Sequence, residues 1–119
     1  MKIYEYNGCS TCKKALKFLK DRGLKFEQIA IVETPPSKVE LRKMLGFLRE
    51  QGGDFKKLFN TSGVLYREMK IADKLKAGMT EAEALDLLAA NGKLIKRPFL
   101  LTGTAGAVGF KEDEWKKLV

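Results

Sequence analysis

The sequence predicts an α/β fold built around a four-stranded mixed sheet. Three observations favour this fold class: a short strand-like segment near the N-terminus gives way to helical periodicity, a second strand-like segment follows, and two apolar segments joined by a turn lie near the C-terminus. The 119 residues, 45% hydrophobic and 32% charged, can form one core without disulfide or metal staples. One domain covering residues 1–119 is therefore expected.

The first third of the chain predicts a β-α-β unit. Residues 3–6 have the composition of a short strand, and Asn7-Gly8 after them is a turn signal. Apolar residues then recur with the i, i+3, i+4, i+7 spacing of an amphipathic helix at Cys12, Ala15, Leu16 and Leu19. Residues 24–32 have strand-like content again. Because one helix separates the two strands, a parallel pair is expected.

The middle of the chain is predicted to be helical. Ser37 and Glu40 have the spacing of a capping box, and Thr80 and Glu83 repeat that spacing at the start of a later helix. The pattern between residues 64 and 78 is weak and predicts one short helix over residues 66–69. The helices of residues 37–91 are expected to form an insertion packed beside the sheet.

The last quarter of the chain predicts a β-hairpin followed by a helix. Residues 94–101 run into an apolar strand, residues 102–106 form the turn, and residues 107–110 return as the hairpin partner. Residues 111–119 have the pattern of a final helix. This element order, with Cys-x-x-Cys after the first strand and a proline at the head of the third, is the layout of a thioredoxin-like fold.

The motif Cys9-Ser10-Thr11-Cys12 is the strongest candidate for chemistry. Cys9 comes between a strand and a helix, where unpaired backbone N–H groups and the nearby Lys13 favour the thiolate over the thiol. Cys12 follows one helical turn later, within reach of a mixed disulfide on Cys9. Ser10 and Thr11 can supply caps or hydrogen bonds to the sulfur. Alternatively, Cys12 is a small core residue on the apolar face of the helix.

Two further segments are candidates for binding. A cis peptide bond between Arg97 and Pro98 at the head of the third strand would suit a close approach to the cysteine motif and leave the guanidinium free to bind an oxyanion or a thiolate. The alternative is an exposed arginine beside a trans proline. The polar loop that contains Thr61 and Ser62 can approach an anion through backbone N–H groups, or serve only as a connection.

The amino-acid composition excludes several kinds of catalytic and metal-binding site. The chain has no histidine, which excludes Cys-His and Ser-His catalytic pairs, and its two cysteines cannot supply the four ligands of a structural zinc. No metal and no bound cofactor are therefore expected. The net charge of +8 fits anionic substrates, an acidic protein or a nucleic acid, and equally fits ordinary solubility. No leader or membrane-spanning segment is evident, so a cytoplasmic monomer without direct nucleic-acid or membrane binding is expected.

These residues resemble the arsenate reductase-like (ArsC/Spx/MgsR) family, which contains glutaredoxin-coupled arsenate reductases and the redox-responsive Spx regulators. The resemblance covers nearly the whole chain, and its most specific parts are the segment around Cys9 and Lys96-Arg97-Pro98. It implies that Cys9 is the catalytic cysteine, that Arg97 binds an oxyanion, and that glutathione is a co-substrate.

The resemblance also sets an expectation for arsenate. The family's arsenate reductases have two further arginines, at positions where this chain has Ser62 and the Gly109-Phe110 end of the hairpin. Two missing charge-assisted anchors, each worth about 1.5–3 kcal/mol, predict arsenate binding that is weaker by several orders of magnitude. Genuine arsenate reduction is therefore not expected.

Two functions follow from the resemblance. The first is a thiol-disulfide oxidoreductase in which Cys9 attacks, Cys12 resolves and Arg97 stabilises anionic sulfur. Ser10, Thr11, Lys13, Thr61, Ser62 and Pro98 complete its predicted substrate site, with glutathione, glutaredoxin or thioredoxin as thiol partner. The second is a Spx-like redox-sensing regulator that binds the α subunit of RNA polymerase and changes affinity when the two cysteines are oxidised.

Overall fold

A computed structural model describes all 119 residues, and its centre is a four-stranded mixed sheet. The strands are β1 (Lys2–Glu5), β2 (Glu27–Ala30), β3 (Phe99–Leu101) and β4 (Gly106–Val108), in the order β2-β1-β3-β4. β1 pairs in parallel with β2 and antiparallel with β3, which pairs antiparallel with β4. The predicted β-α-β unit, C-terminal hairpin and mixed sheet are confirmed.

Six α-helices and two short 3₁₀ helices surround the sheet. The α-helices are α1 (Ser10–Asp21), α2 (Lys38–Glu50), α3 (Val64–Glu68), α4 (Ile71–Lys76), α5 (Glu81–Ala90) and α6 (Glu112–Leu118). The 3₁₀ helices are η1 (Phe55–Leu58) and η2 (Gly92–Leu94). No helix combines the length and the apolar composition needed to cross a bilayer.

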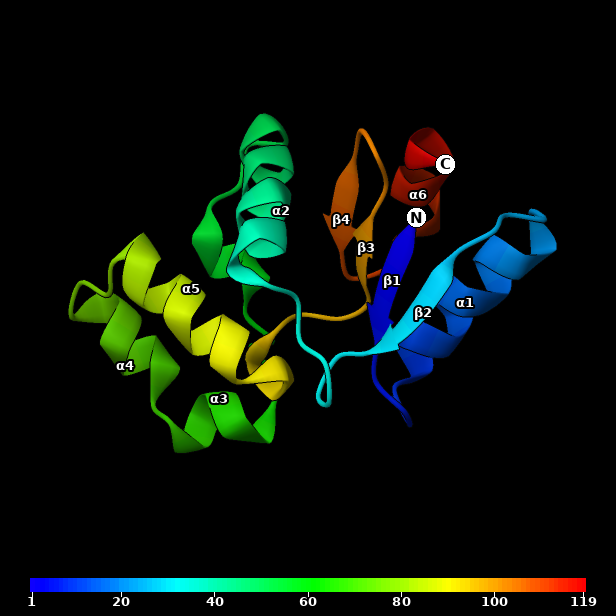
Figure 1. Cartoon of the computed structure of the whole chain (residues 1–119). Coiled ribbons are helices and arrows are strands. Elements are labelled where there is room, and N and C mark those ends of the chain that lie inside the picture. Colours follow the sequence, from blue (N-terminus) through cyan, green and yellow to red (C-terminus); the bar gives the residue numbers. More distant parts are fainter.

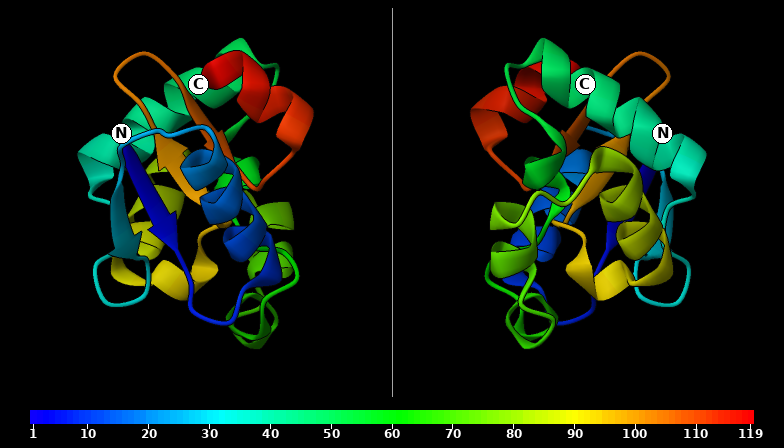
Figure 2. Two further views of the ribbon diagram at one scale, coloured as in Figure 1. Left: turned by 90° about the vertical axis from the view of Figure 1, so that its right-hand side faces the viewer. Right: turned by 90° about the vertical axis from the view of Figure 1, so that its left-hand side faces the viewer.

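The sheet lies between two groups of helices. Figure 1 shows α1 and α6 on one side of it and α2 with the helical block on the other, and Figure 2 shows the same layers from two sides. Alternation along β1 directs Ile3 into the cluster under α1 and α6, and Tyr4 into the larger cluster under α2 and α5. Both faces of the sheet are therefore covered.

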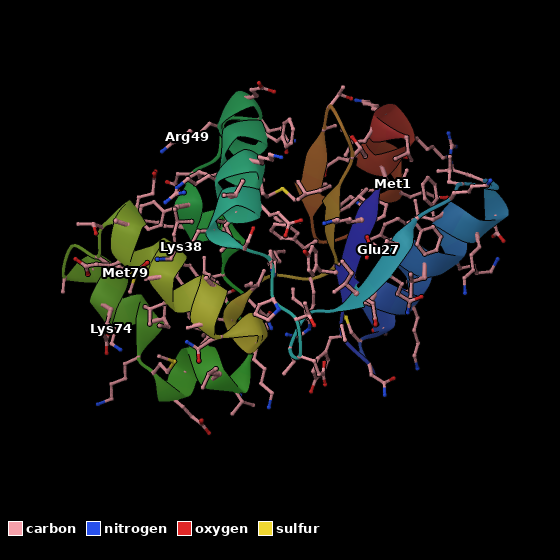
Figure 3. The ribbon with its side chains drawn as sticks, in the orientation of Figure 1. Met1, Glu27, Lys38, Arg49, Lys74 and Met79 are labelled. Atoms are coloured by element: carbon pink, nitrogen blue, oxygen red, sulfur yellow. The ribbon has the colours of Figure 1, made fainter.

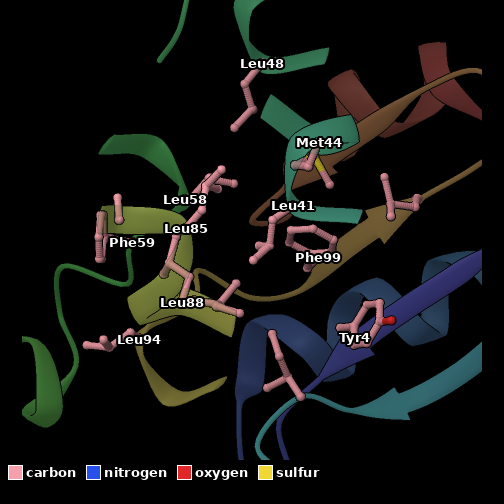
Figure 4. Close-up of a cluster of buried hydrophobic side chains, with 14 of the residues drawn as sticks. Tyr4, Leu41, Met44, Leu48, Leu58, Phe59, Leu85, Leu88, Leu94 and Phe99 are labelled. Carbon is pink, nitrogen blue, oxygen red and sulfur yellow. The ribbon is translucent and has the colours of Figure 1, made fainter. Parts of the chain in front are cut away.

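The larger cluster joins the helical block to the sheet. Leu41 and Met44 of α2 and Leu88 of α5 are fully buried in it together with Phe99 of β3, as Figure 4 shows. The rings of Tyr4 and Phe99 meet edge to face with their centroids 5.6 Å apart. The central helices thus share one apolar cluster with the sheet.

Several element boundaries differ from those predicted. β2 covers only residues 27–30 of the expected 24–32, because the chain turns at once and Thr34 N–H donates to the Ala30 carbonyl. β3 begins at Phe99, since η2 occupies the start of the expected strand. One short helix was expected over residues 66–69, but α3 and α4 are both present, separated by Lys70 in the left-handed region (φ 52°).

Polar contacts connect α2 to its neighbours. The predicted capping box is present, since Glu40 N–H donates to Ser37 Oγ and Ser37 N–H donates to Glu40 Oε1. Glu40 also accepts from Tyr4 Oη at 2.6 Å and pairs with Lys2, so α2 is connected to β1. On the other side of α2, Lys38 and Arg49 (Figure 3) pair with Asp86 and Glu81 of α5.

Acidification is expected to weaken this α2–β1 connection. Burial alone would raise the pKa of Glu40, but hydrogen bonds from Tyr4, Ser37 and Lys2 outweigh it, so the folded-state pKa lies below the ordinary value. A carboxyl with a lowered folded-state pKa stabilises the fold above its unfolded pKa of about 4.3, and that contribution is lost as the pH falls through the folded-state value.

The expected result is a free energy of unfolding that falls on acidification more steeply in the wild type than in Glu40→Gln. Urea unfolding over a pH series measures the difference. Glu50→Gln is the matched control, because Glu50 is an exposed carboxylate of the same helix without an ion pair. Equal pH dependence in the two variants would contradict the assigned role of Glu40.

Candidate active site

Cys9 forms the N-cap of α1. Gly8 turns the chain through the left-handed region (φ 87°), and Cys9 N–H then donates to the Tyr6 carbonyl at 3.2 Å. The Cys9 sulfur accepts a hydrogen bond from Cys12 N–H at 3.3 Å, and the side chain is partly exposed. A sulfur at this position accepts from a backbone N–H and faces the positive end of the helix dipole.

Cys12 lies on the inner face of α1, with 1% of its surface exposed. Burial and the hydrogen bond with Cys9 raise the pKa of the Cys12 thiol to about 12, although a backbone hydrogen bond from Tyr6 and the charge of Arg97 act in the opposite direction. Cys12 is therefore protonated at neutral pH. Cys12 is buried, as expected of a core residue, and it is hydrogen-bonded to Cys9, which is the position that a resolving cysteine needs.

Arg97 stands at the entry to β3. The Arg97-Pro98 bond is cis, as predicted, and Pro98 is buried. The Arg97 guanidinium lies over the ring of Tyr6, 4.3 Å from its centroid, and donates to the Lys93 carbonyl at 3.5 Å. A cation above an aromatic face is attracted by the ring, so Tyr6 helps to hold the arginine in place.

An open groove of about 780 Å³ brings several predicted site residues together. Cys9, Thr11, Thr61, Ser62 and Arg97 all line it, although they come from three separate parts of the chain. This volume is within the range of sites for small molecules and short peptide segments.

Other predicted residues lie outside this lining. Ser10 and Lys13 are exposed on α1 and do not line the groove, whereas Cys12 and Pro98 are buried beneath the surface. A role for Ser10 or Lys13 at the site stays a prediction. The structure contains no group of three or more Cys, Asp or Glu side chains placed to hold a metal ion.

Tyr6 and four lysines were not among the predicted site residues. Tyr6 belongs to the strand pattern of residues 3–6, and nothing in that pattern shows that its ring contacts Arg97, 91 residues further along the chain. The groove is also lined by Lys56, Lys57, Lys96 and Lys111. The one available signal was the sequence Lys96-Arg97-Pro98, which places a second cation beside the arginine.

Removal of the Tyr6 ring is expected to loosen Arg97. Tyr6→Phe keeps the aromatic face, whereas Tyr6→Leu removes an attraction worth about 0.5–1 kcal/mol at a partly exposed site. We therefore expect Tyr6→Leu to slow alkylation of Cys9 at neutral pH by roughly 2- to 5-fold, and Tyr6→Phe to react like the wild type. Arg97→Leu, which removes the guanidinium itself, should slow alkylation at least as much as Tyr6→Leu, and identical rates in all four proteins would contradict the role of Tyr6.

Several known proteins are similar to this chain over most of its length. The uncharacterized protein YusI of Bacillus subtilis (strain 168) is 46% identical over 115 residues, which are 97% of this chain and 94% of YusI. The global transcriptional regulator Spx of Streptococcus pyogenes serotype M3 is 29% identical over 109 residues, which are 89% of this chain and 75% of Spx. A crystal structure of a Bacteroides fragilis protein described as ArsC family related superposes with a TM-score of 0.90 at 43% identity, covering 99% of this chain and 96% of that one.

The family assignment rests on nearly the full length of the chain. The model of the ArsC family matches residues 4–118, which include the cysteine motif, the helical block and the hairpin. The mixed sheet with its covering helices is the thioredoxin-like fold of the family's solved structures. The chain belongs to the ArsC family.

Proposed function

We propose that the chain is a thiol-disulfide oxidoreductase in which Cys9 is the nucleophile. The observation that carries the proposal is the different setting of the two cysteines. The Cys9 sulfur caps α1 and lines an open groove, whereas the adjacent Cys12 is buried and protonated. Such a pair has one sulfur for attack on a substrate and one that reacts only afterwards.

The reaction proceeds by two thiol-disulfide exchanges. The Cys9 thiolate attacks a substrate disulfide, forms a mixed disulfide with one substrate sulfur, and releases the other as a thiolate. Burial is the main cause of the raised pKa of Cys12 in the free protein, and the interactions with Cys9, including the hydrogen bond between the two sulfurs, add to it. Attachment of a substrate to Cys9 removes that second contribution. Cys12 then loses its proton to solvent or to the leaving sulfur and attacks Cys9.

The products of this second exchange are a Cys9–Cys12 disulfide and a second substrate thiol. Two electrons have passed from the cysteine pair to the substrate, so an external thiol must reduce the pair again. Glutathione, glutaredoxin or thioredoxin is the proposed donor, with no bound cofactor. The proposed location is a reducing compartment such as the cytoplasm, where glutathione and thioredoxin keep thiols reduced.

Arsenate is a poor candidate substrate. Among the residues that line the groove, Arg97 is the one arginine, and Arg67 on α3 is exposed outside the lining. Ser62 lies at the groove without a charge, and the other cations of the lining are lysines, which lack the bidentate geometry of a guanidinium. We therefore expect arsenate turnover to be far below disulfide turnover.

A Spx-like regulator is the second candidate function. The similarity to Spx regulators over 89% of this chain supports it, together with a cysteine pair that oxidation can close. In this alternative the chain binds the α subunit of RNA polymerase, and the disulfide changes that affinity. A pull-down with the α subunit that retains nothing from either the reduced or the oxidised protein would exclude it.

A substrate panel tests the enzyme proposal. Hydroxyethyl disulfide, a glutathionylated peptide and arsenate are each offered to the wild type, to Cys9→Ser and to Cys12→Ala, with glutathione and glutaredoxin as reductants. We expect disulfide turnover in the wild type, none above background in Cys9→Ser, and an accumulating mixed disulfide in Cys12→Ala. Wild-type turnover that persists in Cys9→Ser would overturn the assignment of the nucleophile.

A further inference from the structure

Positive charge gathers in the groove around Cys9. Its lining contains five cationic side chains, Lys56, Lys57, Lys96, Arg97 and Lys111, but one carboxylate, Glu114. None of the five takes part in the four ion pairs of the structure, which use other residues. The groove therefore has an uncompensated positive charge next to the reactive sulfur, which attracts anionic ligands.

These cations come from three segments that the fold brings together. Lys56 and Lys57 belong to η1, Lys96 and Arg97 lead into β3, and Lys111 is the N-cap of α6. Several charges from different sides can therefore act on one ligand, which produces more selectivity than isolated surface charges do.

Glycines make room for two of the lysines. A side-chain carbon at Gly53 would lie 2.7 Å from Lys57 Cδ, and one at Gly109 would lie 3.0 Å from Lys96 Cε. Each lysine side chain thus runs across backbone that has no side chain of its own. A side chain at position 53 or 109 would displace the neighbouring lysine side chain.

The size and the lining of the groove fit an extended polypeptide. Its volume of about 780 Å³ far exceeds that of a single small ion, since one water takes up about 30 Å³. Ala107 and Val108 of β4 line one wall, and β4 is the last strand of the sheet. An edge strand offers main-chain N–H and C=O groups to an extended peptide, although at β4 the Gly106 carbonyl already accepts from Gln51 Nε2.

The groove does not suit a nucleic acid. Single-stranded nucleic acids are held by stacking of bases on exposed aromatic rings. The aromatic residues in the lining are Phe59, which is 1% exposed, and Phe110, whose ring packs against Trp115 and Phe18. A nucleic acid also has no sulfur to react with Cys9.

We infer that the substrate is a disulfide borne by an acidic polypeptide segment, which lies in the groove while its sulfur reacts with Cys9. This inference rests on the proposed function and specifies its substrate class. Cys9 exchanges with the peptide disulfide as described above, with two electrons passing to the substrate and a thiol reductant restoring the pair. The lysines bind the Asp and Glu side chains on either side of the substrate cysteine.

Matched peptides test the inference. Three peptides of equal length have one cysteine in a mixed disulfide with 2-mercaptoethanol, and the flanking residues are acidic, neutral amide or basic. Their kcat/KM values are measured at low and at physiological salt. We expect the acidic peptide to exceed the neutral one by at least about tenfold at low salt, the basic peptide to be slowest, and salt to reduce the differences.

Lysine variants test whether the groove cations cause the preference for the acidic peptide. The triple variant Lys56→Gln, Lys57→Gln and Lys111→Gln leaves only Lys96 and Arg97 as groove cations and is expected to lower the ratio of acidic to neutral kcat/KM well below the wild-type ratio. The control variant removes the same charge at exposed lysines away from the groove, Lys20→Gln, Lys43→Gln and Lys74→Gln, and is expected to keep the wild-type ratio.

The possible outcomes separate the inference from the proposed function. If wild-type protein reduces the acidic and neutral peptides equally well, the inference is wrong and the oxidoreductase proposal stands. If none of the peptides nor hydroxyethyl disulfide is reduced, the proposed function itself fails. A control variant that loses the preference as fully as the groove variant would also overturn the inference, because net charge rather than the groove would then set the selectivity.

Discussion

Cys9→Ser is expected to lower the disulfide reductase kcat/KM by at least about 1000-fold. A serine hydroxyl is not ionised at neutral pH, so the first exchange has no nucleophile. The fold should be unaffected, because serine is a favourable N-cap and its oxygen can accept from Cys12 N–H as the sulfur does. Steady-state rates with hydroxyethyl disulfide, together with the thermal midpoint of unfolding, measure both parts of the prediction.

Cys12→Ala is the matched control for that prediction. It leaves Cys9 at the start of α1 and removes only the resolving sulfur, so the first exchange is expected to continue. The mixed disulfide on Cys9 then persists until an external thiol attacks it, and its mass identifies the trapped substrate. A Cys12→Ala protein as inactive in the first exchange as Cys9→Ser would show that both sulfurs are needed for attack.

Gly92→Ala is expected to have the largest effect on stability. A side-chain carbon at residue 92 would lie 1.9 Å from the Ile31 carbonyl oxygen and 2.8 Å from its carbon, both of which belong to the backbone. To avoid this steric clash, η2 must move away from the end of β2. We expect this shift to lower the free energy of unfolding by at least about 3 kcal/mol. The thermal midpoint should fall by roughly 10 °C or more.

Gly46→Ala is the control for this substitution. Gly46 is exposed within α2, and nothing lies within 4 Å of an added side-chain carbon. Alanine is the better helix former, so Gly46→Ala is expected to stabilise the protein by about 0.5–1 kcal/mol. Similar unfolding curves for the two variants would contradict the close approach of η2 to β2.

The parts of the fold that local signals specify could be predicted from the sequence. Turn residues before Cys9 and helical spacing after it identified α1, and the Ser37 capping box marked the start of α2. Boundaries without a recognisable local signal were missed. The division of the weakly patterned segment into α3 and α4 occurs at Lys70, a residue without the glycine signal that usually accompanies a positive φ.

The candidate site was predictable only where its residues have a recognisable sequence signal. Cys9 and Arg97 stand out because a cysteine pair at a strand-helix junction and an Arg-Pro step before a strand have specific chemical uses. The groove lysines do not stand out, because the chain has 23 lysines and arginines and only the fold selects those beside Cys9. The contact between Tyr6 and Arg97 likewise depends on the pairing of β1 with β3.

The most direct measurement is the partition of a limiting amount of iodoacetamide between the two cysteines of the reduced wild-type protein at neutral pH, followed by peptide mapping. An accessible Cys9 sulfur beside a buried, protonated Cys12 predicts at least about tenfold more label on Cys9, with Cys12 labelled only as the pH approaches the strongly alkaline range. Equal labelling of the two sulfurs, or a preference for Cys12, would contradict this division of roles.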